Sequence, residues 1–205
     1  HRERIDAVYS VVEAAPDTAR GLVSAIGWIP RERLQGKVAG LLSSASPLWR
    51  RIGIAACAVH RVDCGRHLTG AIEDPDAALR ARALRAAGEV ARQDLLPAIR
   101  GQLSSEDEAC AFWAAWSMVL LGNRTDGGSA LKYIAMSDSP FAGRALHTLV
   151  RILPPPESRD LLTGIARDPE RQRDLICACG AVGDPVYIPW LIQRMSAEPG
   201  LARLA

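Results

Sequence analysis

Apolar residues along this chain recur three and four positions apart, and short polar turns interrupt them. The clearest stretch places Leu79, Ala83, Leu84 and Ala87 on one face of a helix, because residues with this spacing share a helical face. After a polar turn, a second apolar segment follows at residues 94–103. No stretch alternates in the manner of a β-strand. The pattern therefore predicts an all-helical chain built from helix pairs.

This unit returns with a period of about 30 residues. Arg20, Arg50 and Arg80 stand 30 residues apart, and each opens a helix rich in small residues. One later step is 34 residues, which we attribute to a longer loop between paired helices at residues 122–128. A repeated helix pair of this length is typical of solenoids, in which each unit contacts only its neighbours. We predict an all-α, α-α superhelix of about six helical pairs.

Prolines stand near the start of many units, where the first helical turn needs no N–H donor. Together with the periodicity they predict where each helix lies. The first helices of the pairs are predicted at about 17–27, 47–60, 77–90, 106–121, 140–152 and 170–181. Their partners are predicted at about 31–42, 65–73, 94–104, 129–137, 156–167 and 185–196, and residues 3–14 form the second helix of an earlier unit.

Asp74-Pro75, then Leu79-Arg80 and Ala83 in a helix that ends in glycine, resembles HEAT repeats, including the short type found in phycobilin lyases. The resemblance covers nearly the whole chain. Further segments look like an uncharacterised bacterial HEAT-like family that is loosely associated with type VI secretion loci. These segments are residues 112–116, 183–185, 189–192 and 202–205.

In HEAT repeats the arginine-bearing helices usually line the concave side of the solenoid. The resemblance implies an inner wall that carries Arg20, Arg50, Arg80, Arg144 and Arg203. Cys110 replaces the arginine in one unit, which interrupts the row. A guanidinium at a helix start can donate to aspartates or turn carbonyls. We therefore expect this arginine column to join neighbouring repeats.

A group of tryptophans and arginines forms the candidate binding surface. Trp113 falls in a column of otherwise smaller residues, and Trp116 shares its side of the helix. Such a group is either a local aromatic core or an anchor for a partner, since aromatic residues dominate both. Extra arginines around residues 82–100 form a local positive patch. The candidate partner-binding residues are Trp49, Arg82, Arg85, Phe112, Trp113 and Trp116.

Cys57, His60, Cys64 and His67 have the residue types of a zinc site. The repeat register opposes that interpretation, because Cys57 occupies a packed small-residue position and a four-ligand site would distort the turn. We expect buried cysteines there and no metal. No cysteine has a histidine partner in a readable catalytic motif. We predict no cofactor, no small-molecule substrate and no enzymatic activity.

The 25 basic and 23 acidic residues leave a net charge of +2, which gives no general attraction to nucleic acid or to an anionic membrane. The longest uncharged run, residues 109–123, is too short to span a bilayer. Five cysteines form no paired framework, which favours a reducing cytoplasm. We expect one domain over residues 1–205, truncated at one or both ends, since neither end has the polar face of a capping repeat.

The leading hypothesis is a scaffold that binds another protein on the concave face of the solenoid. The alternative is a nucleic-acid-binding protein, in the manner of HEAT-like DNA glycosylases, although the balanced charge disfavours it. A third interpretation, chromophore chemistry like that of phycobilin lyases, rests on the repeat type alone.

Overall fold

The computed structural model describes residues 2–34, 36–196 and 199–204, and in these ranges the chain forms helices joined by short turns, with no β-strand. The prediction of an all-α helical repeat fold is confirmed. The chain forms two compact units, one up to Leu121 and one from Gly122 onward. None of the described helices is both long and apolar enough to cross a membrane.

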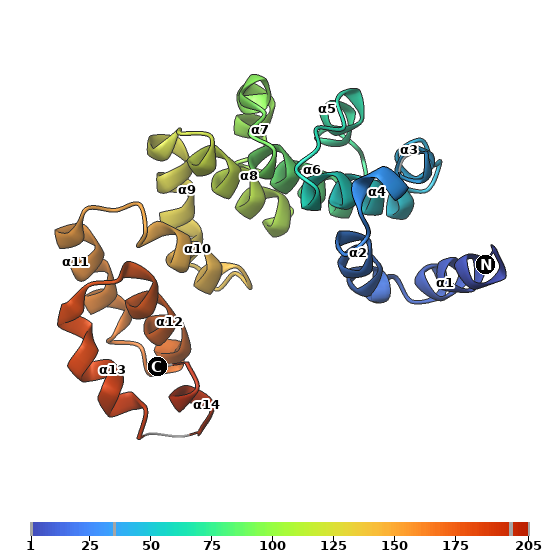
Figure 1. Ribbon diagram of the computed structural model, residues 1–205. Coiled ribbons are helices and arrows are strands. Elements are labelled where there is room, and N and C mark those ends of the chain that lie inside the picture. The colour runs from blue at the N-terminus through green and yellow to red at the C-terminus, as the bar shows by residue number, and fades with distance from the viewer. Residues whose placement is uncertain (1, 35, 197–198, 205) are drawn as a thin grey trace. The chain divides into compact units, whose positions relative to one another are not determined.

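In the first unit, helices with a regular spacing stack side by side in one layer, and shorter helices cover them (Figure 1). The stacked helices are α2 (Ala19–Gly27), α4 (Pro47–Val59), α6 (Ala77–Glu89) and α8 (Glu108–Leu120). The covering helices are α3 (Lys37–Leu42), α5 (Arg66–Ala71) and α7 (Leu96–Gly101), and α1 (Arg2–Ala14) precedes them.

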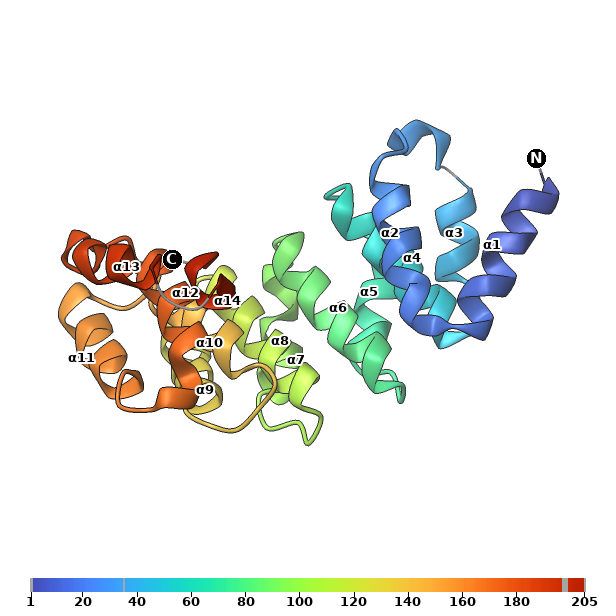
Figure 2. The same ribbon diagram turned by 90° about the horizontal axis from the view of Figure 1, so that it is seen from below.

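In the second unit, α10 packs on α9 and α12, while α11 packs on α12 (Figures 1 and 2). The helices are α9 (Arg124–Ala135), α10 (Ala142–Leu149), α11 (Pro155–Ile165), α12 (Gln172–Val182), α13 (Ile188–Arg194) and α14 (Pro199–Ala202). Arg171 Nη1 donates to the Ala135 carbonyl oxygen at 2.7 Å, which ties the start of α12 to the end of α9.

One predicted loop is wrong. Residues 122–128 were expected to connect two helices, but α9 already begins at Arg124. The Asn123 side chain accepts a hydrogen bond from the Asp126 N–H at 3.1 Å, which satisfies one of the donors left free at a helix start. Gly127 is buried within α9. The N-cap therefore extends the helix through a segment that the 34-residue step had indicated as a loop.

Several of the covering helices begin with a short 3-10 turn, which shortens their α-helical part. Such turns span Arg31–Arg33, Gln93–Leu95, and Pro185–Tyr187 before α13. The predicted helix at 94–104 therefore corresponds to a 3-10 turn followed by α7. The repeats keep their period, because the turn and the helix together occupy the length that one helix was expected to fill.

Two first helices end in the same left-handed turn without a glycine. Arg61 follows α4 with a φ of 53°, and Ala91 follows α6 with a φ of 58°. In each case the next N–H reaches back five residues, from Val62 to the Cys57 carbonyl and from Arg92 to the Ala87 carbonyl. This is the hydrogen-bond pattern of a helix C-cap in which glycine is preferred. An L-residue there stores backbone strain.

We expect Ala91→Gly to raise the free energy of unfolding by about 1 kcal/mol, since glycine adopts the left-handed region without a Cβ clash. Urea denaturation followed by circular dichroism measures this change. Gly183 has a φ of 68° after α12, and no atom lies within 4 Å of a Cβ built on it. Gly183→Ala is the matched reverse substitution and lowers stability. A loss of stability in Ala91→Gly would contradict the strain argument.

Candidate partner-binding surface

Helices α6 and α8 approach closely because small residues line their contact. A Cβ built on Gly88 would lie 2.6 Å from Ser117 Oγ and 3.0 Å from Ser117 Cα. The buried Ser117 hydroxyl donates to the Leu84 carbonyl oxygen at 2.7 Å. This contact fixes the spacing of the two helices, so the side chains on their adjoining faces have defined neighbours.

Aromatic and arginine side chains gather where α6 and α8 meet. The Arg85 guanidinium carbon lies 4.6 Å from the centre of the Trp113 ring, which is a cation–π geometry. The Trp113 and Trp116 rings meet edge to face with centroids 5.4 Å apart. Phe112 meets Trp113 in the same manner at 4.8 Å. The structure thus brings these four candidate residues into one group.

Within this group, exposure differs between the aromatic residues. Phe112 is buried at 1% exposure, whereas Trp113 and Trp116 are half-buried. Trp113 also packs against the core cluster that includes Leu84 and Met118. Each tryptophan therefore has part of its ring in the interior and part on the surface, an arrangement that holds the exposed part in a fixed orientation.

Glu89 compensates part of the positive charge on α6. It pairs with Arg82, and it accepts a hydrogen bond from Arg85 Nε at 2.8 Å. Burial lowers the pKa of Arg82, although the pairing with Glu89 opposes that effect. Arg82 Nε is buried without a hydrogen-bond partner. Two guanidiniums share one carboxylate, so one positive charge remains beside Trp113, and the Arg85 side chain, 43% exposed, carries it toward solvent.

Trp49 does not belong to this group. It is buried at 8% exposure, and its indole N–H donates to Glu13 Oε1 at 2.9 Å. Its ring lies 4.6 Å from that of Tyr9. Trp49 therefore attaches α1 to α4, and its indole is engaged within the protein.

The predicted arginine column divides into two kinds of residue. Arg50 donates to the carbonyl oxygens of Ser44 and Ala45, and Arg80 donates to those of Asp74 and Pro75, at 2.8–3.1 Å. Arg50 also pairs with the Asp74 carboxylate of the next repeat at 2.8 Å. In α8, the Cys110 thiol donates to the Ala77 carbonyl oxygen at 3.4 Å instead. The remaining members are exposed: Arg20, Arg144 and Arg203.

The four residues of zinc-ligand type do not gather around one point. In the part of the chain that the structure describes, no group of three or more His, Cys, Asp or Glu side chains is placed to hold a metal ion. A hydrogen bond between the thiols of Cys57 and Cys64 lowers the pKa of Cys57 and raises that of Cys64. His60 instead faces the Ile26 carbonyl oxygen at 3.2 Å, and His67 lines a separate hollow beside Arg50 and Asp74.

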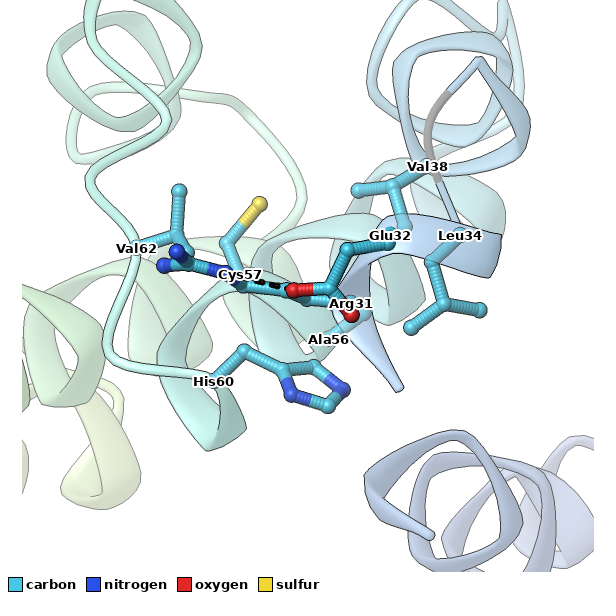
Figure 3. Close-up of a pocket in the computed structure, with 8 residues that line it drawn as sticks. All are labelled: Arg31, Glu32, Leu34, Val38, Ala56, Cys57, His60 and Val62. Carbon is cyan, nitrogen blue, oxygen red and sulfur yellow. Dashed lines mark hydrogen bonds and ion pairs between the residues drawn. The ribbon is translucent and has the colours of Figure 1, made fainter. Parts of the chain in front are cut away.

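A pocket of about 340 Å³ lies against the end of α4 (Figure 3), and sequence reasoning missed it. We call it the α4 pocket. Its lining consists of Arg31, Glu32, Leu34, Val38, Ala56, Cys57, His60 and Val62. Backbone hydrogen bonding and the Arg31 guanidinium lower the pKa of Glu32, so this carboxylate stays ionised. Residues 31–38 had been assigned to a covering helix. The 3-10 turn at Arg31–Arg33 that breaks this helix has no signal in the periodicity.

Comparison with known families matches residues 66–141 to the family model described as HEAT repeats. The match extends from α5 through α9 and includes the whole group around Trp113. This part of the all-helical chain is therefore similar to HEAT repeats. Comparisons with curated proteins and with solved structures find no significant match.

Proposed function

We propose that this protein is a non-enzymatic scaffold that binds another protein through α6 and α8, with Trp113, Trp116 and Arg85 as anchors. HEAT repeats generally mediate contacts between proteins, and the match covers these helices. The observation that carries the proposal is the half-buried Trp113 ring, held between Arg85 and Trp116. Tryptophan and arginine are enriched among the residues that dominate binding energy.

Pre-organisation supports this choice of residues. The Trp113 ring contacts Phe112 and Trp116, and Arg85 is fixed by Glu89. Side chains already held in one conformation lose little entropy when a partner binds. The exposed guanidinium of Arg85 suits a partner that offers a carboxylate or a backbone carbonyl next to an apolar surface.

The shared carboxylate of Glu89 disfavours nucleic acid as the partner. Nucleic-acid binding draws most of its affinity from basic groups that neutralise phosphates. Glu89 instead sits between Arg82 and Arg85 and would face the phosphate backbone. We also propose that the scaffold acts in the cytoplasm of a bacterium and, by its resemblance, near type VI secretion components. All five cysteines are free thiols, which accords with a reducing compartment.

We expect Trp113→Ala to weaken partner binding by about 30-fold, which corresponds to roughly 2 kcal/mol for a central anchor. Affinity capture with the full chain, with nuclease present, identifies proteins retained by the wild type and lost by the variant. Isothermal titration then measures the affinity of each retained protein. Arg85→Gln is expected to weaken binding about tenfold, because it removes the cation and keeps a polar side chain.

Tyr133→Ala is the matched control, since Tyr133 is an aromatic residue with 80% exposure outside this surface. It is expected to retain the partner fully. Circular dichroism melting shows whether Trp113→Ala remains folded, and Arg85→Gln tests the surface without removing a ring from the core. Partners that bind both variants as tightly as the wild type would refute the proposed surface. Loss of all retained proteins after nuclease treatment would favour nucleic acid.

A further inference from the structure

The α4 pocket continues into an exposed apolar patch, which consists of Trp28, Ile29, Val59 and Val62 with exposures of 88%, 39%, 50% and 38%. The end of α2 touches the end of α4 here, because a Cβ built on Gly27 would lie 2.9 Å from Val59 Cγ1. Val62 belongs to both the pocket and the patch. Apolar side chains gathered around a hollow are typical of a surface that binds a partner.

The pocket itself offers an apolar interior with polar groups at one side. Leu34, Val38 and Ala56 supply aliphatic surface, while the paired side chains of Arg31 and Glu32 are about 70% exposed (Figure 3). The volume is at the lower end of the range for ligand sites, roughly 300–1,000 Å³. It therefore has room for a single bulky apolar side chain rather than for a long stretch of chain.

Three basic residues are adjacent in sequence to residues that line the pocket. Arg33 follows the lining residue Glu32, Lys37 precedes Val38, and Arg61 lies between His60 and Val62. All three are exposed, and none forms an ion pair within the described ranges. Glu32 is already paired with Arg31, and the nearby Asp63 pairs with Arg92 at 2.9 Å. The charge of these three cations is therefore available to a partner.

We propose that the α4 pocket and its apolar patch bind a second protein segment, one that carries a bulky apolar side chain flanked by acidic residues. The apolar side chain enters the pocket, and the neighbouring carboxylates pair with Arg33, Lys37 and Arg61. This surface is separate from the one around Trp113, since it is built from the ends of α2 and α4 and residues 31–34. The scaffold thus has two binding surfaces in its first unit.

The apolar patch distinguishes this partner from two others. A nucleic acid would use the cations but would gain little from the aliphatic side chains of Val59 and Val62, because its phosphates draw their affinity from basic groups. A small molecule that filled the pocket would leave the patch exposed to water. A segment with both apolar and acidic residues covers the pocket, the patch and the cations together.

Fluorescence anisotropy with labelled peptides of about twelve residues tests the proposal on the full chain. One peptide has a central leucine between glutamates, a second has alanine in place of leucine, and a third has lysines in place of the glutamates. We expect the first to bind with a dissociation constant on the order of 10–100 µM, since a short flexible peptide loses entropy on binding. The second and third peptides are expected to bind at least about tenfold more weakly.

Matched protein variants locate the binding. The double variant Arg33→Glu with Lys37→Glu is expected to weaken the first peptide about tenfold or more, because it reverses two exposed charges. The double variant Arg124→Glu with Lys132→Glu makes the same charge change at two exposed residues of the second unit and is expected to have no effect. A photo-crosslinking group in place of the leucine is expected to attach to Leu34, Val38 or Val62 and not to residues of α8.

The outcomes separate the proposal from its alternatives. Equal binding of all three peptides, no binding in the millimolar range, or crosslinks on α8 would each overturn it. Binding of an oligothymidine probe that is lost in the double variant, with no peptide binding, would assign the surface to nucleic acid. Trp113→Ala is expected to leave peptide binding unchanged, so failure here and failure of the proposed function are distinct results.

Discussion

Gly88→Val is expected to lower the free energy of unfolding by about 3 kcal/mol, a cost typical of overpacking a close contact. The added side chain meets Ser117, whose Cα lies 3.0 Å from the position of the new Cβ. The Ser117 Cα is a backbone atom, so it cannot move aside as the end of a flexible side chain could. The two helices must move apart, which also breaks the hydrogen bond from Ser117 to Leu84. Chemical denaturation of the full chain measures the change.

Gly70→Ala in α5 is the matched control for this prediction. Gly70 is also a helical glycine, but no atom lies within 4 Å of a Cβ built on it. Its replacement is expected to raise stability by roughly 0.5–1 kcal/mol, because alanine restricts the unfolded chain more than glycine does. If both substitutions changed stability by the same amount, close packing of α6 on α8 would not be the cause.

Asp74→Ala is expected to cost about 2–3 kcal/mol, since it leaves a partly buried guanidinium without its carboxylate. Asp74 Oδ2 pairs with Arg50 at 2.8 Å, and Asp74 Oδ1 accepts from the Asp76 N–H at 3.0 Å. The side chain of Asp74 is 15% exposed and that of Arg50 is 26% exposed. Partial exposure keeps the expected cost below that of a fully buried pair.

Asp74→Asn separates the two roles of this carboxylate. The amide oxygen can still accept the hydrogen bond from Asp76, but the charge that faces Arg50 is gone. We expect an intermediate loss of about 1 kcal/mol, measured in the same denaturation series. The mutation Arg50→Ala combined with Asp74→Ala is expected to cost less than the sum of the two single changes, because the two side chains interact directly. Strict additivity would show that the pair contributes nothing.

The periodicity predicted most helices of the first unit because each repeat buries the same face. The predicted 47–60 and 77–90 correspond to α4 at Pro47–Val59 and α6 at Ala77–Glu89. Helix starts were harder to predict, since capping by Asn123 and 3-10 turns such as Arg31–Arg33 depend on single hydrogen bonds. A hydrophobic pattern averages over several residues and does not detect them.

The candidate surface was partly predictable for a related reason. Phe112, Trp113 and Trp116 lie within one or two turns of one helix, so helical spacing alone brings them together. The contact of Trp113 with Arg85 also follows the repeat, since successive first helices stack. Trp49 contacts Glu13 and Tyr9 of α1, which lies outside that regular stack. The α4 pocket depends on the 3-10 turn at Arg31–Arg33, for which no repeat supplies a template.

The ties between repeats have a consequence for the synthesis of the chain. Arg50 reaches Asp74 over 24 residues, Arg92 reaches Asp63 over 29, and Cys110 reaches Ala77 over 33. Each partner is thus made within about one repeat of the other. A chain whose contacts are this local folds quickly, because little loop entropy is lost before a contact forms. Each repeat can therefore dock on the one before it while the ribosome is still translating the next.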